Sequence, residues 1–161
     1  MSNKILIICP TFNEAQNIEE FIKLTLENNL SLLIVDDNSP DGTANLVKKS
    51  TAFNQNVFLI ERPSKDGLGS AYRTGFKWFL DSHFDYCVEM DADFSHRFTD
   101  LENIINKISE SDIVIGSRYI ENGGSKGWDF KRKTLSKYAN ILAKYILKSK
   151  GLLALEIGNG Q

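Results

Sequence analysis

The stretch YCVEMDADFSH, residues 86–96, decides the expected fold, because a short apolar run of strand character stops at two aspartates and a helical pattern follows. Where a strand of an α/β protein ends, its side chains point into the ligand crevice and not into the core. Asp91 and Asp93 have no lysine nearby in the sequence, and two such carboxylates repel each other unless a cation lies between them. A divalent cation with oxygen ligands, which also holds a substrate diphosphate, explains the pair most simply. The alternative is a pair of solvated loop residues in front of a helix.

The rest of the chain alternates apolar runs of strand length with helical patterns. The expected strands are residues 4–9, 32–35, 56–60, 86–90 and 112–116. The expected helices are residues 13–28, with Asn13 as the N-cap, and residues 43–50, 70–80 and 101–108. This alternation predicts βαβ units and a mainly parallel central sheet, so the expected fold class is α/β.

Length and composition favour one domain over residues 1–161, because 42% of the residues are hydrophobic and can form a core. The chain lacks the overall basic charge of a nucleic-acid-binding protein, since its net charge is −2. Residues 126–150 nevertheless contain eight basic residues and one acidic residue, which favours a local anion-binding face.

A C-terminal helix is expected over residues 131–149, where an apolar stripe is accompanied by lysines that lie largely off it. It is either an ordinary amphipathic helix packed on the sheet or a helix near a membrane surface, with lysines facing lipid phosphates. No signal peptide and no apolar run of about 20 residues is visible, so we expect a soluble or peripheral protein. Cys9 and Cys87 are interpreted as small buried hydrophobes in a reducing compartment.

Three expected strand ends carry side chains suited to one activated nucleotide. After the first strand, Phe12 offers an aromatic face and Glu14 a carboxylate. After the second strand, Asp36 and Asp37 can accept hydrogen bonds from a base or a ribose. For Asp37, the alternative is a helix-capping role. The aspartate pair after the fourth strand can hold a metal on the diphosphate. Their convergence is more specific than any one of them.

Six separated motifs resemble the family-2 glycosyltransferases. They are CPTFNEAQNI (residues 9–18), VDDNSPDGT (35–43), RPSKDGLGSAYRTGF (62–76), MDADFSH (90–96), VIGSRY (114–119), and Arg132 with SKYAN (136–140). The motifs follow the family's order and cover nearly the whole chain. Within the family, the chain is most similar to the polyprenyl-phosphate mannosyltransferases, dolichyl-phosphate β-mannosyltransferase above all.

The resemblance implies a GT-A nucleotide-sugar-binding, Rossmann-like fold. It implies a metal-dependent, inverting transfer of mannose from GDP-mannose to dolichyl or polyprenyl phosphate, with Mg²⁺ or Mn²⁺ as the cofactor. It further implies a position at the cytoplasmic face of a membrane, with peripheral membrane contact and a membrane-anchoring subunit as a partner. The residues alone specify neither guanine nor the sugar.

The resemblance also implies roles for individual residues. The nucleotide-binding positions are Pro10, Phe12, Glu14, Val35 and Asp37. The diphosphate and metal motif is Asp91, Ala92 and Asp93, and Ser95 matches a position that supplies a metal ligand in some relatives. The positions that hold the sugar diphosphate and the acceptor phosphate are Arg118, Arg132 and Ser136.

The residues alone are consistent with this chemistry. An acceptor phosphate is already an anionic nucleophile, so the reaction needs positioning and charge relief and no strong general base. Arg118 and Arg132 can supply bidentate contacts, and with Asp93 they are the expected catalytic residues. A metal would act as a Lewis acid on the leaving GDP. The alternative for both arginines is an ordinary surface position.

Other polar residues near these motifs have less specific interpretations. Arg62 and Lys65 either contact phosphates or lie in a solvated loop. His96 is expected to be a structural hydrogen-bonding residue and not a metal ligand. Gly67 and Gly69 do not complete the G-x-G-x-x-G fingerprint, which argues against NAD binding.

Two features depart from the family pattern. Phe12 stands where the family often has tyrosine, so stacking is retained and a hydroxyl contact is lost. Relatives continue past residue 161 into a segment with a Gly-Phe-Arg-type motif and basic residues that help hold the donor, so we expect a C-terminally shortened fold. A truncated chain, a natural short form and one half of a split enzyme all stay open.

Three rival functions also stay open. The first is another family-2 hexosyltransferase, for example with a glucosyl donor. The second is a truncated, non-catalytic module that binds a nucleotide sugar. The third is a metal-dependent nucleotidyltransferase, but this class usually needs a glycine-rich triphosphate loop after its first strand, and PTFNE (residues 10–14) is not one.

Overall fold

The computed structural model describes residues 4–108, 111, 113, 114 and 116. The chain divides into two compact units, Met1–Phe94 and Ser95–Gln161. The expected C-terminal helix at about 131–149 lies outside the described residues. The expectation of a single domain over residues 1–161 stays a prediction.

The first unit is built on a four-stranded parallel sheet with the strand order β3-β2-β1-β4. The strands are β1 (Ile5–Thr11), β2 (Ser31–Asp36), β3 (Val57–Glu61) and β4 (Tyr86–Glu89). The helices are α1 (Ile18–Glu27), α2 (Thr43–Lys49) and α3 (Leu68–Leu80) in the first unit and α4 (Phe98–Ile105) in the second. The expected α/β class with a parallel sheet is confirmed.

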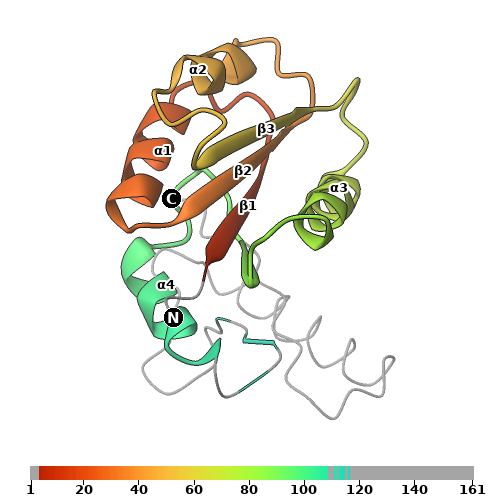
Figure 1. Ribbon diagram of the computed structural model, residues 1–161. Coiled ribbons are helices and arrows are strands. Elements are labelled where there is room, and N and C mark those ends of the chain that lie inside the picture. Colours follow the sequence, from red (N-terminus) through yellow and green to blue (C-terminus); the bar gives the residue numbers. More distant parts are fainter. Residues whose placement is uncertain (1–3, 109–110, 112, 115, 117–161) are drawn as a thin grey trace, which may run out of the picture. The chain divides into compact units, whose positions relative to one another are not determined.

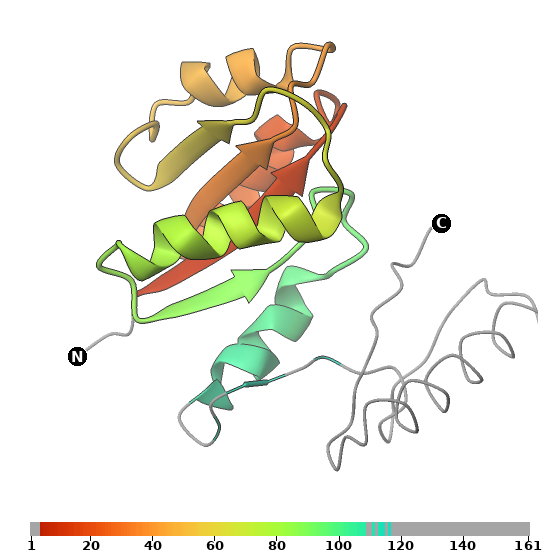
Figure 2. The ribbon, with the colours of Figure 1, turned by 90° about the vertical axis from the view of Figure 1, so that its right-hand side faces the viewer.

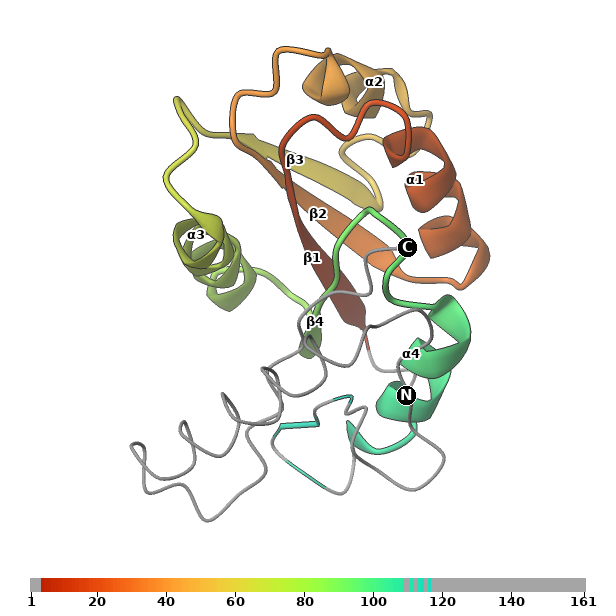
Figure 3. The same ribbon diagram turned by 180° about the vertical axis from the view of Figure 1, so that it is seen from behind.

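Helices cover both faces of the sheet in the first unit. Helices α1 and α2 lie on one face and α3 on the other (Figures 1 and 3). Figure 2 shows α3 running along the sheet in front of the strands. A strand that is covered on both faces needs apolar side chains at successive positions. Ile5–Cys9 and Leu32–Val35 are at most 8% exposed, which explains their continuous apolar sequences.

The core beneath α3 is formed by alternate residues of β1 and β2, because successive side chains of a strand point to opposite faces. Its buried members are Leu6, Ile8, Leu33, Val35 and Ala71. Partly buried residues pack against them: Phe58, Ile60, Tyr72, Phe76, Trp78, Phe79, Phe84 and Cys87. These contacts fix α3 to the sheet over most of its length.

Gly75 allows α3 to approach β1 closely. A Cβ atom at this position would lie 2.4 Å from Ile8 Cγ2, which is inside van der Waals contact. Gly69, in the first turn of the same helix, has no atom within 4 Å of an added Cβ. The need for a glycine therefore comes from the packing of α3 on the sheet and not from its helical conformation.

Helix α1 begins at Ile18, later than the start expected at Asn13. The N-cap is Asn17, so the assignment of Asn13 as the N-cap is wrong. Asn13 has a φ of 64°, in the left-handed region that asparagine tolerates better than most residues. Its amide donates a hydrogen bond to Ser39 Oγ (3.0 Å). The loop after β1 therefore turns toward the loop after β2 before the helix starts.

The prediction of a fifth strand over residues 112–116 is wrong for the three of these residues that the structure describes. Ile113, Val114 and Gly116 have no strand conformation. An apolar run forms a strand only where a neighbouring strand completes its hydrogen bonds, and Ile113 is 78% exposed. Residues 112 and 115 lie outside the described residues.

The second unit contains helix α4, which begins at Phe98 instead of the expected Leu101. The side chain of Arg97 closes the first turn, because its Nε and Nη2 atoms donate to both Asp100 oxygens at 2.8 and 3.0 Å. Across the described part of the chain, no helix is long and apolar enough to cross a membrane. Cys9 and Cys87 are free thiols, buried and half-buried respectively.

Candidate functional site

The carboxyl ends of the first three strands are level with one another along one edge of the sheet. Thr11 of β1 pairs in register with Asp36 of β2, and Asp36 pairs with Glu61 of β3. Strand β4 runs parallel to β1 and ends at Glu89, beside Ile8. The loops that leave this edge carry the polar side chains, as in the ligand crevice of other parallel α/β sheets.

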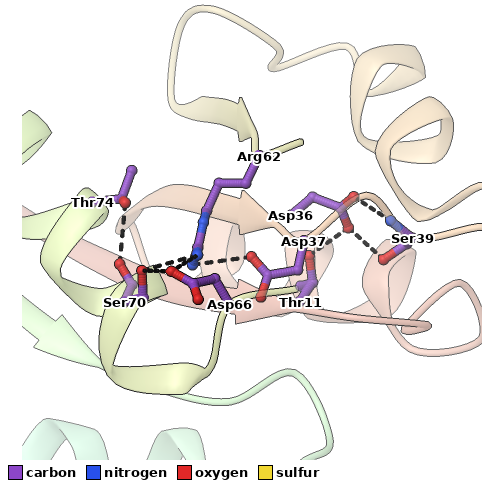
Figure 4. Close-up of polar contacts among 8 residues, drawn as sticks. All are labelled: Thr11, Asp36, Asp37, Ser39, Arg62, Asp66, Ser70 and Thr74. Carbon is purple, nitrogen blue, oxygen red and sulfur yellow. Dashed lines mark hydrogen bonds and ion pairs between the residues drawn. The ribbon is translucent and has the colours of Figure 1, made fainter. Parts of the chain in front are cut away.

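Asp36 has a structural role. Its Oδ1 accepts hydrogen bonds from Thr11 Oγ1 (2.8 Å) and Ser39 Oγ (2.6 Å), and its Oδ2 accepts one from the Ser39 amide (2.8 Å). Figure 4 shows the carboxylate between these two residues. Asp36 is 1% exposed, with both oxygens engaged. These contacts give Asp36 a role in joining the loops after β1 and β2, and its expected contact with a base or a ribose stays a prediction.

Asp37 forms a nearly buried ion pair with Arg62, which follows β3. Arg62 Nη1 lies 3.1 Å from Asp37 Oδ1, and the two side chains are 9% and 7% exposed. Neither atom has a hydrogen-bond partner among the described residues, because their contact has the distance of an ion pair but not the alignment of a hydrogen bond. Buried polar atoms normally have such partners. The pair therefore retains hydrogen-bonding capacity at the sheet edge.

Helix α3 braces the arginine of this pair. Arg62 Nη2 donates to Ser70 Oγ (3.0 Å), and Ser70 Oγ donates to Asp66 Oδ2 (3.1 Å) (Figure 4). The backbone amide of Arg62 donates to the Asp36 carbonyl (2.8 Å). The interpretation of Arg62 as a solvated loop residue is wrong. Its position directly after β3, beside the strand that ends in Asp36–Asp37, is the sequence signal that could have identified it.

Three consecutive amides of the loop after β1 donate to side chains of the loop after β2 and of the first residue of α2. Their acceptors are Ser39 Oγ for Asn13 (3.0 Å), Thr43 Oγ1 for Glu14 (3.1 Å) and Asp41 Oδ2 for Ala15 (2.9 Å). Slight desolvation acts to raise the pKa of the exposed Asp41 carboxyl, but hydrogen bonds from Thr43 and Ala15 outweigh it, and the pKa is lowered. Asp41 thus fixes the conformation of the β1 loop as a carboxylate.

Phe12, in the β1 loop, presents its ring toward the loop after β3. Lys65 Nζ lies 4.0 Å from the centroid of the ring, in cation–π contact. The ring is half-buried, and Lys65 is exposed. The aromatic face expected for stacking therefore lies at the same edge as the Asp37–Arg62 pair.

Asp91 and Asp93 follow β4 at the other end of this edge. Asp91 is half-buried, and Asp93 is exposed. Tyr72 of α3 donates a hydrogen bond from its hydroxyl to Asp91 Oδ1 (3.3 Å). Partial burial and the charge of Asp91 raise the pKa of the Glu89 carboxyl. Three acidic residues thus gather where β4 ends.

The pKa of the Cys9 thiol is affected by acidic residues of two loops. Burial raises its pKa well above the ordinary value, and the charges of Asp91, Glu14 and Asp93 raise it further. Cys9 is fully buried in β1, between the other strands. The thiol is neutral, and carboxylates from both the β1 loop and the β4 loop lie near enough to act on it.

This acidic end of the edge fits a divalent cation. Mg²⁺ and Mn²⁺ prefer oxygen ligands, and Mg²⁺ is often held by one or two carboxylates together with substrate phosphates. Asp91 and Asp93 supply such a pair. No group of three or more ligating side chains occurs among the residues that the structure describes. A cation here would therefore need further oxygen ligands from a bound substrate and from water.

The candidate residues fall into three groups. The residues of the first unit are Pro10, Phe12, Glu14, Val35, Asp37, Asp91, Ala92 and Asp93. Ser95 is half-buried and begins the second unit, and Arg118, Arg132 and Ser136 lie outside the described residues. Val35 and Ala92 are at most 1% exposed, so their side chains pack inside the protein.

The sequence matches a family model over nearly its whole length. The model for glycosyl transferase family 2 matches residues 6–155. The chain belongs to this family. Its parallel sheet with helices on both faces is the GT-A type of fold, so the fold that the resemblance implied is confirmed.

Two curated relatives have names that refer to polyprenyl lipids and mannose. A polyprenol monophosphomannose synthase from Mycolicibacterium smegmatis is 37% identical over 150 residues, which cover 91% of this chain and 57% of the relative. An undecaprenyl-phosphate mannosyltransferase from Micrococcus luteus is 36% identical over 150 residues, which cover 89% of this chain and 60% of the relative. The chain therefore spans somewhat more than half the length of these two relatives.

A solved structure of a mannosyltransferase is also similar to this family-2 chain. The protein is the mannosyltransferase PcManGT from Pyrobaculum calidifontis, in complex with GDP-Man and Mn²⁺. The similarity has a TM-score of 0.50 and a sequence identity of 27%, and it covers 58% of this chain and 28% of the other.

Proposed function

We propose that this family-2 chain binds GDP-mannose with a divalent cation and transfers mannose to the phosphate of a polyprenyl lipid. The family, the two mannosyl-lipid relatives and the GDP-Man complex of the structural neighbour support this proposal. One observation on the chain carries it. A buried Asp37–Arg62 pair and the acidic Asp91–Asp93 segment lie on the same sheet edge.

The separation of these two groups suits a nucleoside diphosphate. The strand order places β1 between β2 and β4, and neighbouring strands lie about 4.8 Å apart, so β2 and β4 are about 10 Å apart. A base at Asp37 and a diphosphate at Asp91–Asp93 would leave the ribose over the β1 loop. Phe12 and Glu14 lie in that loop.

The Asp37–Arg62 pair would bind the edge of the base. The carboxylate can accept a hydrogen bond from a ring N–H, and the guanidinium can donate to an adjacent carbonyl. Asp37 Oδ1 and Arg62 Nη1 are buried, so binding in this way would require the two groups to turn toward the ligand. Guanine and uracil both present an N–H beside a carbonyl, so guanine is proposed because of the relatives.

Asp91 and Asp93 would hold Mg²⁺ or Mn²⁺ together with diphosphate oxygens. When bound, the ion supplies positive charge to the leaving diphosphate. Tyr72, hydrogen-bonded to Asp91, and the buried Ala92 between the two aspartates would limit how far the pair can move. In this proposal the positive charge lies on the diphosphate that leaves C1 of mannose.

In the proposed reaction, an oxygen of the lipid phosphate forms a bond to C1 of mannose while the bond from C1 to GDP breaks, with inversion at C1. The nucleophile is already anionic, so no side chain has to remove a proton. Arg118, Arg132 and Ser136, which the family motifs assign, would hold the sugar diphosphate and the acceptor phosphate. Peripheral contact with the cytoplasmic face of a membrane and a membrane-anchoring subunit belong to this proposal, since the acceptor is a lipid.

The test is transfer of radiolabelled mannose from GDP-mannose to polyprenyl phosphate in detergent with Mn²⁺. We expect a mannosyl lipid that extracts into organic solvent, and no product when the metal is chelated. Even indirect changes around a metal ligand cost about 10- to 100-fold in activity, so Asp93→Asn should cost at least about 100-fold. Asp81→Asn, an exposed change at the end of α3, is the matched control and should retain activity.

Another hexosyl donor is the second candidate, because the Asp37–Arg62 pair also fits uracil. The same assay with UDP-glucose in place of GDP-mannose distinguishes the two candidate donors. A glucosyl lipid in place of a mannosyl lipid would overturn the mannose assignment and keep the site. Donor binding without transfer from either nucleotide sugar would favour a non-catalytic module.

A further inference from the structure

Tyr72 joins α3 to the acidic end of the sheet edge. Its hydroxyl donates to Asp91 Oδ1 at 3.3 Å, across 19 positions of sequence. Tyr72 lies inside the RPSKDGLGSAYRTGF motif, which the nucleotide and metal assignments leave without a role at this position. The contact belongs wholly to the first unit, which contains both α3 and Asp91.

The position of this hydroxyl is set by the packing of α3. Ala71 is 1% exposed, and Gly75 admits Ile8 to a distance that a side chain would prevent, so this face of α3 lies directly on the sheet (Figure 2). The ring of Tyr72 packs against the core and stacks on Phe76, with the ring centroids 6.2 Å apart. A group held on a packed helix orients its partner more strictly than a group on a loop does.

The chemistry of the contact is directional. The ordinary pKa of a tyrosine hydroxyl is about 10, so such a group is protonated at neutral pH. A protonated phenol that faces a carboxylate acts as the donor. The hydrogen bond occupies one direction of Oδ1 and restrains rotation of the carboxyl group.

We propose that Tyr72 is a positioning residue that orients the Asp91 carboxylate for the cation and the diphosphate. This inference rests on the proposed function, because it assigns Tyr72 to the same metal-dependent nucleotide site. Tyr72 touches neither the substrate nor the reacting atoms in this account. It acts through Asp91, as hydrogen-bonded outer partners orient metal-ligating carboxylates in other proteins.

The test is the effect of Mn²⁺ on GDP affinity, measured by calorimetry on the full chain with and without metal. Tyr72→Phe keeps the ring and removes the hydroxyl. We expect the metal-dependent gain in GDP affinity to fall about tenfold, while GDP affinity without metal stays unchanged. Tyr86→Phe is the matched control: it removes a half-buried hydroxyl from β4, the strand that leads to Asp91, and should leave both values unchanged.

A second measurement separates positioning from general damage. In an Asp91→Asn background, Tyr72→Phe should have no further effect on the metal-dependent gain, because the two residues act as one unit. Electron paramagnetic resonance of Mn²⁺ bound with GDP should show a changed signal for Tyr72→Phe and an unchanged one for Tyr86→Phe.

The outcomes distinguish this inference from the function on which it rests. If wild type gains no GDP affinity with Mn²⁺, the proposed metal site is overturned, and the role of Tyr72 with it. If wild type shows the gain and Tyr72→Phe keeps it in full, only the positioning role is overturned. Equal loss of affinity with and without metal would also overturn it, because the effect would not act through Asp91.

Discussion

The two ends of the sheet edge differ in how their charges are held. At the Asp37–Arg62 end, a carboxylate and a guanidinium are 7% and 9% exposed and balance each other, and Ser70 of α3 braces the arginine. At the Asp91–Asp93 end, Asp93 is exposed and further acids lie nearby. Among the described residues, the charges at the Asp37–Arg62 end therefore balance, whereas the Asp91–Asp93 end carries an excess of negative charge. The first end is prearranged, and the second favours a cation.

The largest effect is expected where the prearranged end is broken. Arg62→Met would leave the Asp37 carboxylate nearly buried without its cation, which typically costs about 3–5 kcal/mol of unfolding free energy. Arg73→Met, at an exposed position of α3, should change stability by less than about 0.5 kcal/mol. Urea denaturation measures both. Adding Asp37→Leu should recover most of the loss, and a loss below about 1 kcal/mol for Arg62→Met would contradict the buried pair.

A change in α3 should disturb both ends together. Gly75→Ala places a Cβ 2.4 Å from Ile8 Cγ2 and forces the helix away from β1. Overpacking of this kind costs about 1–3 kcal/mol. Gly69→Ala, with no atom within 4 Å of the added Cβ, should not destabilise the protein. Thermal unfolding of the two variants tests the close packing, and equal stability for both would argue against it.

A smaller effect is expected from the hydrogen bonds that hold Asp36. Thr11→Val removes the buried donor at 2.8 Å and leaves the two bonds from Ser39. A hydrogen bond to a charged group contributes about 1.5–3 kcal/mol, so we expect a loss of about 1.5 kcal/mol. Thr51→Val, at an exposed turn, is the control. An unchanged denaturation midpoint for Thr11→Val would show that Asp36 does not depend on this contact.

The smallest effect is a pH-dependent one at Asp41. Its pKa is lowered in the folded protein, so it contributes stability above its unfolded pKa of about 3.9 and loses it as pH falls through the folded pKa. Asp41 is exposed, so the contribution should stay below about 1 kcal/mol. Asp41→Asn should therefore be less stable than wild type at pH 7, with the difference shrinking below about pH 4. Urea denaturation at several pH values, with Asp81→Asn as the control, measures this. A difference independent of pH would contradict the role of the carboxylate charge.

The sequence was sufficient for the four strands of the observed sheet and for the polar edge at their carboxyl ends, although it also predicted a fifth strand. The apolar runs at residues 4–9 and 32–35 predicted strands covered on both faces, because such strands need apolar side chains at successive positions. The aspartates after the second and fourth strands predicted a polar edge, because the topology of a parallel sheet brings these ends together. The motifs predicted the family, which the match over residues 6–155 confirms.

The sequence could not separate residues whose roles depend on distant partners. Asp36 and Asp37 are adjacent and chemically identical, but Thr11 and Ser39 engage the first and Arg62 engages the second. Asn13 looked like a helix cap, but its amide bonds to Ser39 in the next loop. Apart from the contact between Asp36 and Ser39, which are three positions apart, these outcomes depend on residues 25 or 26 positions apart, which local patterns do not encode.

The most direct test of the account is calorimetric titration of GDP-mannose, with and without Mn²⁺, on wild type, Asp93→Asn and Asp81→Asn. The account predicts that Mn²⁺ tightens GDP-mannose binding to wild type and Asp81→Asn, and that Asp93→Asn loses this gain. Metal-independent binding of equal strength to all three proteins would contradict the proposal that the Asp91–Asp93 end holds the cation and the diphosphate.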